Sequence, residues 1–265
     1  MLLENKTAVV YGGGGAIGGA AARAFAREGA QVHLAGRTPD KLEAVAQEIQ
    51  ADGGAAEVAL LDALDEGAVR EHADAVAARA GGIDVALNAI GIPHVQGIPF
   101  AELSLDDYLH PITAYCRTNF VTAQAVARHM VAQASGVILT ISTSGSRLAV
   151  PGTINYSTTC AAIEATTRLL AAELGPCGVR VVCLQPDVIP EAGKMGSHTR
   201  GNFQPWAERL GVTIDEFLAA PPDRTLLKRW PTLADVAEAA AFIASDRAAA
   251  TTGTVINLTA GSVVN

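Results

Sequence analysis

The sequence predicts an α/β fold in which a seven-stranded parallel sheet carries helices on both faces. Seven short runs rich in β-branched residues alternate with longer, alanine-rich segments of helical spacing. This alternation indicates βαβ units joined by right-handed crossovers. Most of the short runs are predominantly apolar, without alternation of polar and apolar residues, as strands covered on both sides are. Apolar residues fill 49% of the 265 positions and charged residues only 17%, which favours a large buried core.

The expected strands span residues 7–11, 31–35, 56–60, 84–88, 136–141, 179–184 and 253–258. A helix is expected after the first strand, from about Ile17 to Arg27. The next helix is the best marked, because Thr38 can cap it and Pro39 suits its first turn. Its apolar face consists of Leu42, Val45, Ala46 and Ile49, and Gly53-Gly54 ends it.

Residues 186–231 fit the alternation poorly, because this stretch is rich in Pro and Gly and holds both tryptophans. We expect a long loop with short helices that covers a site as a lid. Its aromatic residues could line an apolar site or simply pack; they are Phe203, Trp206, Phe217 and Trp230. No linker or low-complexity tract divides the chain, so one domain over residues 1–265 is expected.

Charge and cysteine content exclude several classes of protein. The net charge of −8 argues against nucleic-acid binding, which usually requires a basic surface. No apolar run reaches the ~18 residues of a membrane span, and no signal peptide is recognisable. The four cysteines lack CxxC spacing, and no HxxxH or HExxH pattern suggests a metal site. We therefore expect a cytoplasmic protein that binds a small molecule and no metal.

A glycine-rich turn joins the first strand to its helix. Residues 11–18 read Tyr-Gly-Gly-Gly-Gly-Ala-Ile-Gly, and Gly13, Gly15 and Gly18 satisfy GxGxxG. Strand before and helix after are the context in which such glycines let the backbone approach a pyrophosphate at a helix N-terminus. A plain strand-to-helix turn is the alternative, but consecutive glycines cost backbone entropy without adding any packing. The turn therefore predicts a dinucleotide site.

The end of the second strand predicts which dinucleotide binds. An NAD site has an acidic residue here for the ribose 2′-hydroxyl, whereas an arginine accommodates the 2′-phosphate of NADP. This sequence has Arg37 followed by Thr38, so NADP(H) is favoured over NAD(H). The alternative is a solvated arginine beside a helix cap.

Together these motifs resemble the short-chain dehydrogenase/reductase family over nearly the whole chain. The glycine turn resembles its Thr-Gly-x-x-x-Gly-x-Gly, with Tyr11 and Ala16 as departures, and residues 88–91 resemble its Asn-Asn-Ala-Gly. The resemblance implies a Rossmann-type fold and a cofactor site on residues Gly12, Gly15, Ile17, Gly18, Arg37, Thr38, Asp62, Ala63, Asn88, Gly91, Pro186 and Val188. It also implies a homo-oligomer, a dimer or tetramer, paired through long helices at about residues 105–133 and 154–174.

The family's catalytic tetrad is largely replaced. Its tyrosine matches Tyr156, and its serine falls on Thr143, so a hydroxyl remains. Its asparagine falls on Tyr115, with Asn119 one helical turn away, and its lysine falls on Cys160. The resemblance therefore implies Tyr156 and Thr143 as the catalytic residues.

Loss of the lysine has a chemical consequence. A free tyrosine has a pKa of ~10, and in the family an ammonium one helical turn away lowers it so that a phenolate can accept a proton. Cys160 offers no charge, and we expect it to be a buried filler rather than a nucleophile. Neutral Tyr156 can still donate a proton, so reduction is expected rather than oxidation. Lys194 could replace the missing amine.

Two carboxylates also fall near the expected nicotinamide side. Asp187 replaces a glycine of the family, and Glu191 replaces the threonine that holds the carboxamide. They could favour a positively charged ring, but we expect them to point into solvent, because the loop is surface-biased.

Three functions remain open at this point. The first is an NADP(H)-dependent reductase of a carbonyl or activated alkene on a small apolar molecule. The second is an enzyme of this fold without redox turnover, such as an isomerase, dehydratase or cyclase. The third is a non-catalytic nucleotide-binding sensor.

Overall fold

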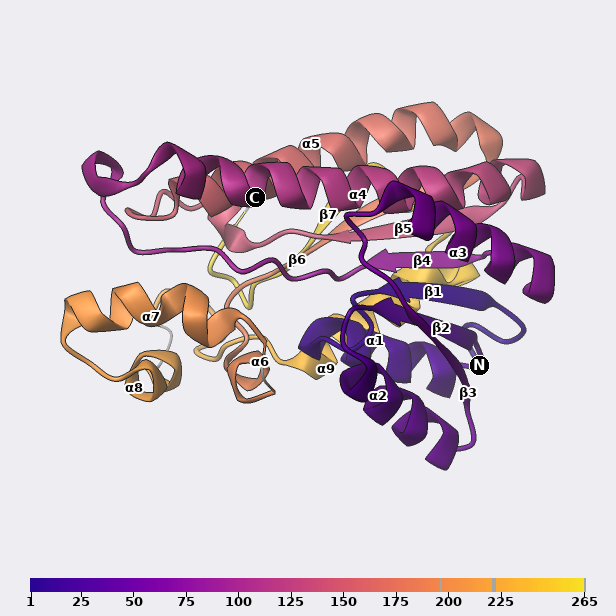
Figure 1. Cartoon of the computed structure of the whole chain (residues 1–265), viewed down its shortest axis with the longest axis horizontal. Coiled ribbons are helices and arrows are strands. Elements are labelled where there is room, and N and C mark those ends of the chain that lie inside the picture. Colours follow the sequence, from indigo (N-terminus) through magenta and orange to yellow (C-terminus); the bar gives the residue numbers. More distant parts are fainter. Residues whose placement is uncertain (196, 221–222, 265) are drawn as a thin grey trace.

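The sheet has seven parallel strands in the order β3-β2-β1-β4-β5-β6-β7, as the computed structural model shows (Figure 1). The model describes residues 1–195, 197–220 and 223–264. The strands are β1 (Thr7–Tyr11), β2 (Gln31–Gly36), β3 (Ala55–Leu60), β4 (Val85–Asn88), β5 (Gly136–Ile141), β6 (Val179–Pro186) and β7 (Thr254–Leu258). The predicted Rossmann-type fold is confirmed, and each strand lies within two residues of its expected bounds. The strand order reverses between β1 and β4, where ligands of such sheets bind.

Helices cover both faces of the sheet (Figure 1). On one face lie α1 (Ala16–Arg27), α2 (Pro39–Ala51) and α9 (Leu233–Ala244). On the other lie α3 (Glu66–Ala80), α4 (Leu105–Gln133) and α5 (Ile154–Leu174). Successive residues of a strand enter opposite core layers: Val10 packs on the α1 side, whereas Val9 and Tyr11 pack on the α3 and α4 side. This two-sided burial explains why the strand sequences are mainly apolar on both faces.

Helix α2 shows how local sequence sets an element. It begins at Pro39 and buries the four apolar residues that were expected to form its inner face. Thr38 occupies the N-cap position but makes no side-chain capping hydrogen bond. After the helix, Gly53 adopts a φ of +82°, a conformation that glycine reaches at little cost.

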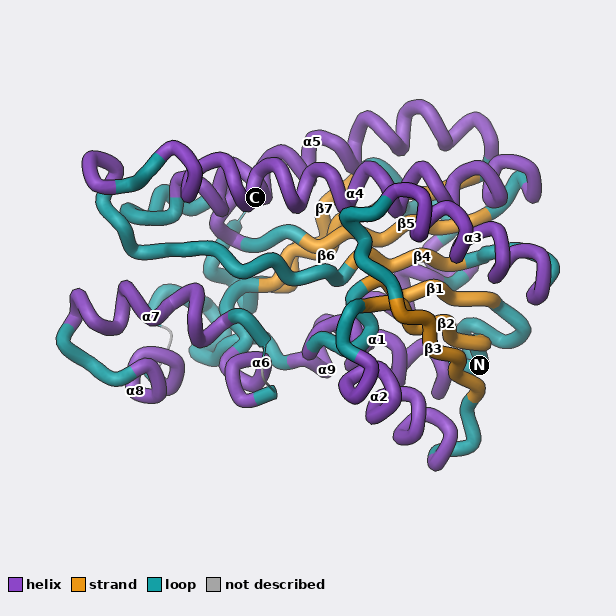
Figure 2. The backbone as a smooth tube through the Cα atoms, in the orientation of Figure 1, coloured by secondary structure: helices purple, strands orange, loops and turns teal. Residues whose placement is uncertain are grey.

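The lid segment (residues 186–231) lies beyond the carboxyl ends of the strands (Figures 1 and 2). It contains the short helices α6 (Pro190–Lys194), α7 (Thr199–Leu210) and α8 (Ile214–Ala219). Positions 196, 221 and 222 of this predicted segment, and position 265 of the predicted domain, lie outside the described residues.

Within the described residues, none of the helices combines the length and the apolar character that crossing a membrane requires.

Candidate functional site

A first cavity of about 340 Å³ opens at the point where the strand order reverses. Its walls come from the glycine turn, the loops after β2, β3 and β4, helix α4, and the start of the lid segment. Residues expected to bind the cofactor that line it are Gly12, Gly15, Ile17, Arg37, Thr38, Asp62, Ala63, Asn88 and Gly91. Residues far apart in the chain thus meet in one cleft.

The glycine turn is packed too tightly for side chains. Gly12 has a φ of +81°, and a Cβ there would lie 2.6 Å from the carbonyl oxygen of Ala89. A Cβ at Gly18 would collide with the carbonyl oxygen of Gly12, so Gly18 allows the first turn of α1 to pack directly against the glycine turn. Gly15 is the N-cap of α1 and provides no side-chain cap. The N–H groups of the first turn of α1 are therefore available to an anion in the cavity.

One end of the cavity is cationic. Arg37 and Lys41 line it together with Asp62. The Arg37 guanidinium lies 3.9 Å from an Asp62 carboxylate oxygen, and both side chains are about half exposed. Asp62 also accepts a hydrogen bond from the backbone N–H of Leu64 at 3.0 Å, which fixes its loop. The acidic residue expected of an NAD site is absent after β2, and Arg37 stands there instead.

The inner wall of the cavity carries polar side chains. The Asn88 amide donates to the Thr122 hydroxyl at 2.9 Å, and its carbonyl oxygen accepts from the N–H of Ile90. Asn119 donates to the carbonyl of Tyr115 at 2.9 Å, but its own Oδ1 has no hydrogen-bond partner among the described residues. The tight glycine cradle, the available helix N–H groups and this unpaired acceptor all fit a dinucleotide.

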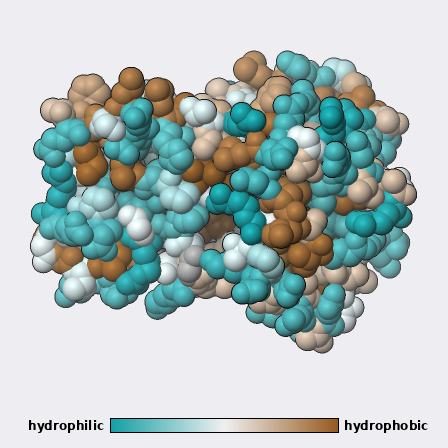
Figure 3. Space-filling view, viewed as in Figure 1, coloured by the Kyte–Doolittle hydropathy of each residue, from teal (hydrophilic) through white to brown (hydrophobic). Residues whose placement is uncertain are grey.

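A second cavity of about 420 Å³ adjoins the first and lies under the lid segment. Both cavities are lined by Ile17, Tyr156 and Asn202, among others. Aromatic side chains of the lid form one wall, with Phe203, Trp206 and Phe217 in mutual ring contact at 5.6–6.1 Å. Figure 3 shows a recess with apolar side chains between the lid segment and the sheet. The aromatics expected to line a site do line this one.

Tyr156 lies at the border between the two cavities. Burial, followed by the neighbouring Cys160 and Tyr115, raises its pKa well above 10. The phenol is therefore protonated near neutral pH, the form that can donate a proton.

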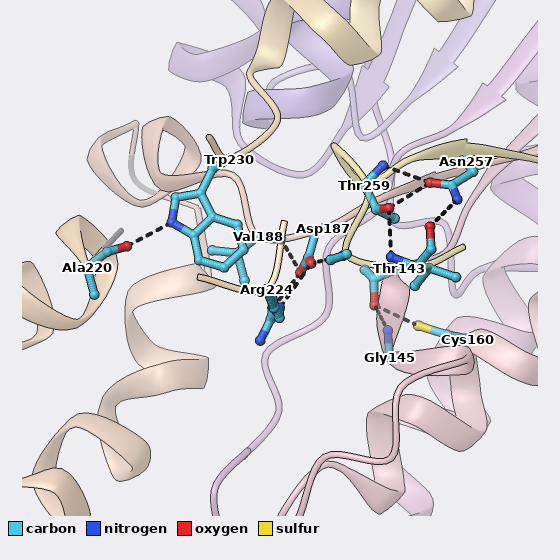
Figure 4. A network of polar contacts seen from close by, with 12 residues as sticks. Thr143, Gly145, Cys160, Asp187, Val188, Ala220, Arg224, Trp230, Asn257 and Thr259 are labelled. Carbon is cyan, nitrogen blue, oxygen red and sulfur yellow. Dashed lines mark hydrogen bonds and ion pairs between the residues drawn. The ribbon is translucent and has the colours of Figure 1, made fainter. Parts of the chain in front are cut away.

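Cys160 lies one turn further along α5 and is 1% exposed. Its sulfur is 3.6 Å from the Thr143 hydroxyl, which also accepts from the N–H of Gly145 (Figure 4). Burial raises the pKa of the thiol to about 12, so it carries no charge at neutral pH. Thr143 itself lines the second cavity.

An aromatic cluster holds Tyr156 from the other side. The imidazole of His94 stacks on the Tyr156 ring, with centroids 4.3 Å apart and planes 21° apart. His94 Nδ1 faces the carbonyl of Ile92 at 2.8 Å, and Nε2 lies 2.9 Å from the Gln96 amide. Nδ1 therefore carries the proton and Nε2 accepts. Burial holds the pKa of His94 at about 4, so the ring is neutral.

Tyr115, at the family's asparagine position, contacts the same loop. Its hydroxyl accepts from the N–H of Ile92 at 3.0 Å. Its ring centroid is 5.8 Å from that of Tyr156, and burial raises its pKa to about 12. Tyr115 therefore places a second neutral phenol beside the first.

A buried carboxylate supports the strand end that carries Thr143. Glu164 accepts from Ser142 at 2.8 Å, Ser146 at 2.5 Å and Gln185 at 2.7 Å. It lies two turns after Tyr156 on α5. These bonds fix the backbone on both sides of Thr143.

The structure corrects two expectations about charged residues, those for Asp187 and Lys194. Asp187 does not point into solvent: its side chain is 2% exposed and pairs with Arg224 at 2.8 Å (Figure 4). Glu191 is exposed, as expected, and its carboxylate accepts from the N–H of Leu233, at the start of α9. Lys194 does not line either cavity among the described residues, and its charge acts on Asp215 of α8 instead.

The remaining predicted residues are also placed. Pro186 and Val188 line the second cavity, and Tyr115 lines the first. Sequence reasoning missed His94, Asn202 and Glu164. A histidine three residues after the Asn88–Gly91 motif was a visible signal for the first; the other two had none.

Comparison with known proteins gives a consistent result. A family model described as enoyl-(acyl carrier protein) reductase matches residues 14–262. The D-threitol dehydrogenase of Mycolicibacterium smegmatis is 30% identical, over 99% of this chain and 94% of the relative. The gluconate 5-dehydrogenase of Gluconobacter oxydans is also 30% identical, over 99% and 96%.

Solved structures agree with the fold. A short-chain type dehydrogenase/reductase from Mycobacterium ulcerans superposes with a TM-score of 0.83 at 26% identity, covering 99% of this chain and 91% of the other. An NAD+-bound xylitol dehydrogenase superposes with a TM-score of 0.89 over 98% and 100% of the chains. Its identity is 24%, so this likeness concerns the fold alone.

Proposed function

The chain belongs to the short-chain dehydrogenase/reductase family of oxidoreductases, and on that premise we propose that it is an NADP(H)-dependent reductase of a carbonyl or activated alkene on a small apolar molecule. The observation that carries the proposal is the position of Tyr156. A phenol that stays neutral lies where a cationic, glycine-lined cleft meets an aromatic cavity. That arrangement suits proton donation beside a bound dinucleotide.

The chain's own residues account for the proton and the orientation of the substrate. NADPH, when bound, supplies the hydride. Tyr156 donates its phenolic proton to the oxygen on which negative charge develops, and Thr143 donates a hydrogen bond to the same oxygen. Glu164 holds the strand end of Thr143, and His94 holds the ring of Tyr156. The aromatic wall excludes water from the reacting atoms.

The direction of reaction follows from the same phenol. Oxidation needs a phenolate, and the burial that raises the pKa of Tyr156 opposes its formation. Reduction uses the protonated form, which is already present. We therefore propose that this chain favours reduction near neutral pH.

Arg37 and Lys41 support the preference for NADP(H). Both side chains line the first cavity at the end that is formed by the loop after β2 and the start of α2. A guanidinium there suits a 2′-phosphate, which carries close to two negative charges at neutral pH.

The lining of the second cavity supports an apolar substrate. The relatives' names refer to threitol and gluconate, whereas the cavity wall here consists largely of Phe203, Trp206, Phe217 and aliphatic side chains. We propose a flat or alicyclic ketone or enone, held by ring contacts with this wall.

We also propose a cytoplasmic homo-oligomer, a dimer or tetramer formed through α4 and α5. Phe120 on α4 and Leu169 on α5 are 57% and 66% exposed, respectively, in the single chain. Light scattering after gel filtration tests this assembly, and a monomer of 27.2 kDa would contradict it.

The function is tested by following NADPH absorbance with a panel of cyclic and aryl ketones, enones and polyol-derived ketones. We expect turnover with apolar members and a loss of about a hundredfold or more in Tyr156→Phe, with NADPH affinity unchanged. NADPH binding without turnover on any ketone or enone would favour a non-redox enzyme or a sensor. Equal rates in wild type and Tyr156→Phe would contradict the role of the phenol.

A further inference from the structure

A histidine of the lid segment lies at the mouth of the first cavity. His198 lines this cavity together with Ser197, Thr199 and Asn202. A Cβ added to Gly91, on the opposite side of the opening, would lie 3.4 Å from His198 Cδ2. The imidazole therefore spans the cleft between the lid and the loop after β4.

Two contacts fix this position. The carbonyl of His198 accepts from the N–H of Asn202 at 2.9 Å, within the first turn of α7. Asn202 Oδ1 accepts in turn from the N–H of His94 at 3.1 Å. The segment that carries His198 is thus tied to the loop that contacts Tyr156.

The charges around His198 are mainly positive. Burial, followed by the charges of Arg37 from the loop after β2 and Lys41 from α2, lowers the pKa of His198, and both cations line the same cavity. Asp62 is the acidic residue of the same opening and pairs with Arg37. His94, on the loop after β4, is neutral. His198 is therefore a neutral imidazole that lines the same cavity as two cations.

We propose that His198 is a phosphate-binding residue of the lid, which takes up a proton when the dinucleotide enters the cleft and then contacts one of its phosphates. This inference rests on the proposed binding of NADP(H). His198 would then add to the affinity for the cofactor from the lid segment, separately from the glycine turn and Arg37. Because His198 is the N-cap of α7, which carries Phe203 and Trp206 of the aromatic wall, the same contact links cofactor binding to the substrate cavity.

The sign of the proton change follows from the charges. A phosphate between His198 and the two cations stabilises the imidazolium, so it raises the pKa of His198. The raised pKa gives uptake of a fraction of a proton for each dinucleotide bound at pH 7.5. The 2′-phosphate has its own second pKa near 6, and binding beside cations would make it release protons. Net uptake therefore reports on the protein.

The experiment is calorimetric titration of NADPH and of NADH at pH 7.5, in buffers of different ionisation enthalpy, with wild type, His198→Gln and His129→Gln. His129 is the control, because it lies on α4 beside Asp74 and lines neither cavity. We expect uptake in wild type and His129→Gln and none in His198→Gln. From pH 8.5 to 7.0 the wild-type affinity should rise about threefold, while that of His198→Gln stays flat.

The outcomes separate the possible explanations. Uptake with both dinucleotides identifies the diphosphate as the partner, and uptake with NADPH alone identifies the 2′-phosphate. Binding without uptake, or uptake that persists in His198→Gln with an unchanged melting temperature, overturns the proposal for His198 and leaves the proposed function standing. Absence of binding by either dinucleotide contradicts the proposed function itself.

Discussion

Returning the family's lysine to position 160 tests the chemistry most sharply. In Cys160→Lys an ammonium would enter α5 one turn after Tyr156, beside the Thr143 hydroxyl. The Glu164 carboxylate is close enough to raise the pKa of Cys160, so the new cation would have a counter-charge nearby. We expect the variant to fold, with a lower melting temperature than wild type because position 160 is fully buried.

The size of the effect follows from the pKa of the phenol. At pH 8 a tyrosine with a pKa of 10 is ionised in about one molecule in a hundred, and burial keeps Tyr156 below that fraction. A cation within ~4–6 Å lowers such a pKa by about one to three units. Oxidation of the alcohol should therefore become about 10- to 1000-fold faster below pH 9, which corresponds to about 1.4–4 kcal/mol. Reduction, which uses the neutral phenol, should change by less than about threefold.

The assay measures kcat/KM for both directions from pH 6.5 to 10, with a ketone found in the NADPH panel and its alcohol. Cys160→Met is the matched control, because it lengthens the side chain without adding charge. The reasoning is refuted if the wild type already oxidises the alcohol with a pH profile that levels off below pH 8. A folded Cys160→Lys that binds NADP+ but gains no oxidation would refute it equally.

Three other predictions concern cofactor choice and stability. Arg37→Ser should lower the affinity for NADPH by about 10- to 100-fold and that for NADH by less than about threefold in fluorescence titrations. The reason is that a hydrogen bond from a charged group to the 2′-phosphate is worth about 1.5–3 kcal/mol. Equal losses of affinity for both dinucleotides would contradict the role of Arg37 in binding the 2′-phosphate. Asp187→Asn should lower the free energy of unfolding in urea by about 1–3 kcal/mol, because the buried carboxylate of Asp187 binds Arg224. The partial exposure of Arg224 limits this loss of stability. An unchanged urea midpoint would show that the ion pair contributes nothing to stability. Burial holds the pKa of His72 at about 4, below the ~6.5 of an unfolded chain, so the unfolded state binds the proton first as the pH falls. The free energy of unfolding should therefore fall from pH 6.5 toward pH 4 by up to about 1.4 kcal/mol per pH unit. His72→Phe should make this pH dependence less steep, and an identical slope in both proteins would contradict the lowered pKa.

The fold was predictable because its determinants are local. Strands such as Thr7–Tyr11 are buried at every position and mainly apolar because both faces of the sheet are covered, and the bounds of α2 follow from Pro39 and Gly53. The glycine turn was also predictable, because the backbone packs too closely at Gly12 and Gly18 for any residue with a side chain, so the sequence has glycine there. These features need no knowledge of distant contacts.

The parts that escaped prediction depend on such contacts. Asp187 suggested a solvated carboxylate, but Arg224, 37 residues away, and Ser262, 75 residues away, both bind it. The stacking of His94 on Tyr156 joins the loop after β4 to the first turn of α5, and periodicity does not relate these two segments. The partners of a charged or aromatic side chain depend on where the lid segment and the C-terminal residues pack against the rest of the chain. The spacing of residues in the sequence does not determine this packing.

The proposed function requires that the first cavity hold an NADP(H) molecule beside a protonated Tyr156. A crystal structure of the protein grown with NADPH tests this directly. We expect density for the whole dinucleotide, with its diphosphate at the first turn of α1, its 2′-phosphate on Arg37 and its nicotinamide beside Tyr156 and Thr143. An empty cleft at saturating NADPH, or a dinucleotide bound elsewhere, would contradict the account.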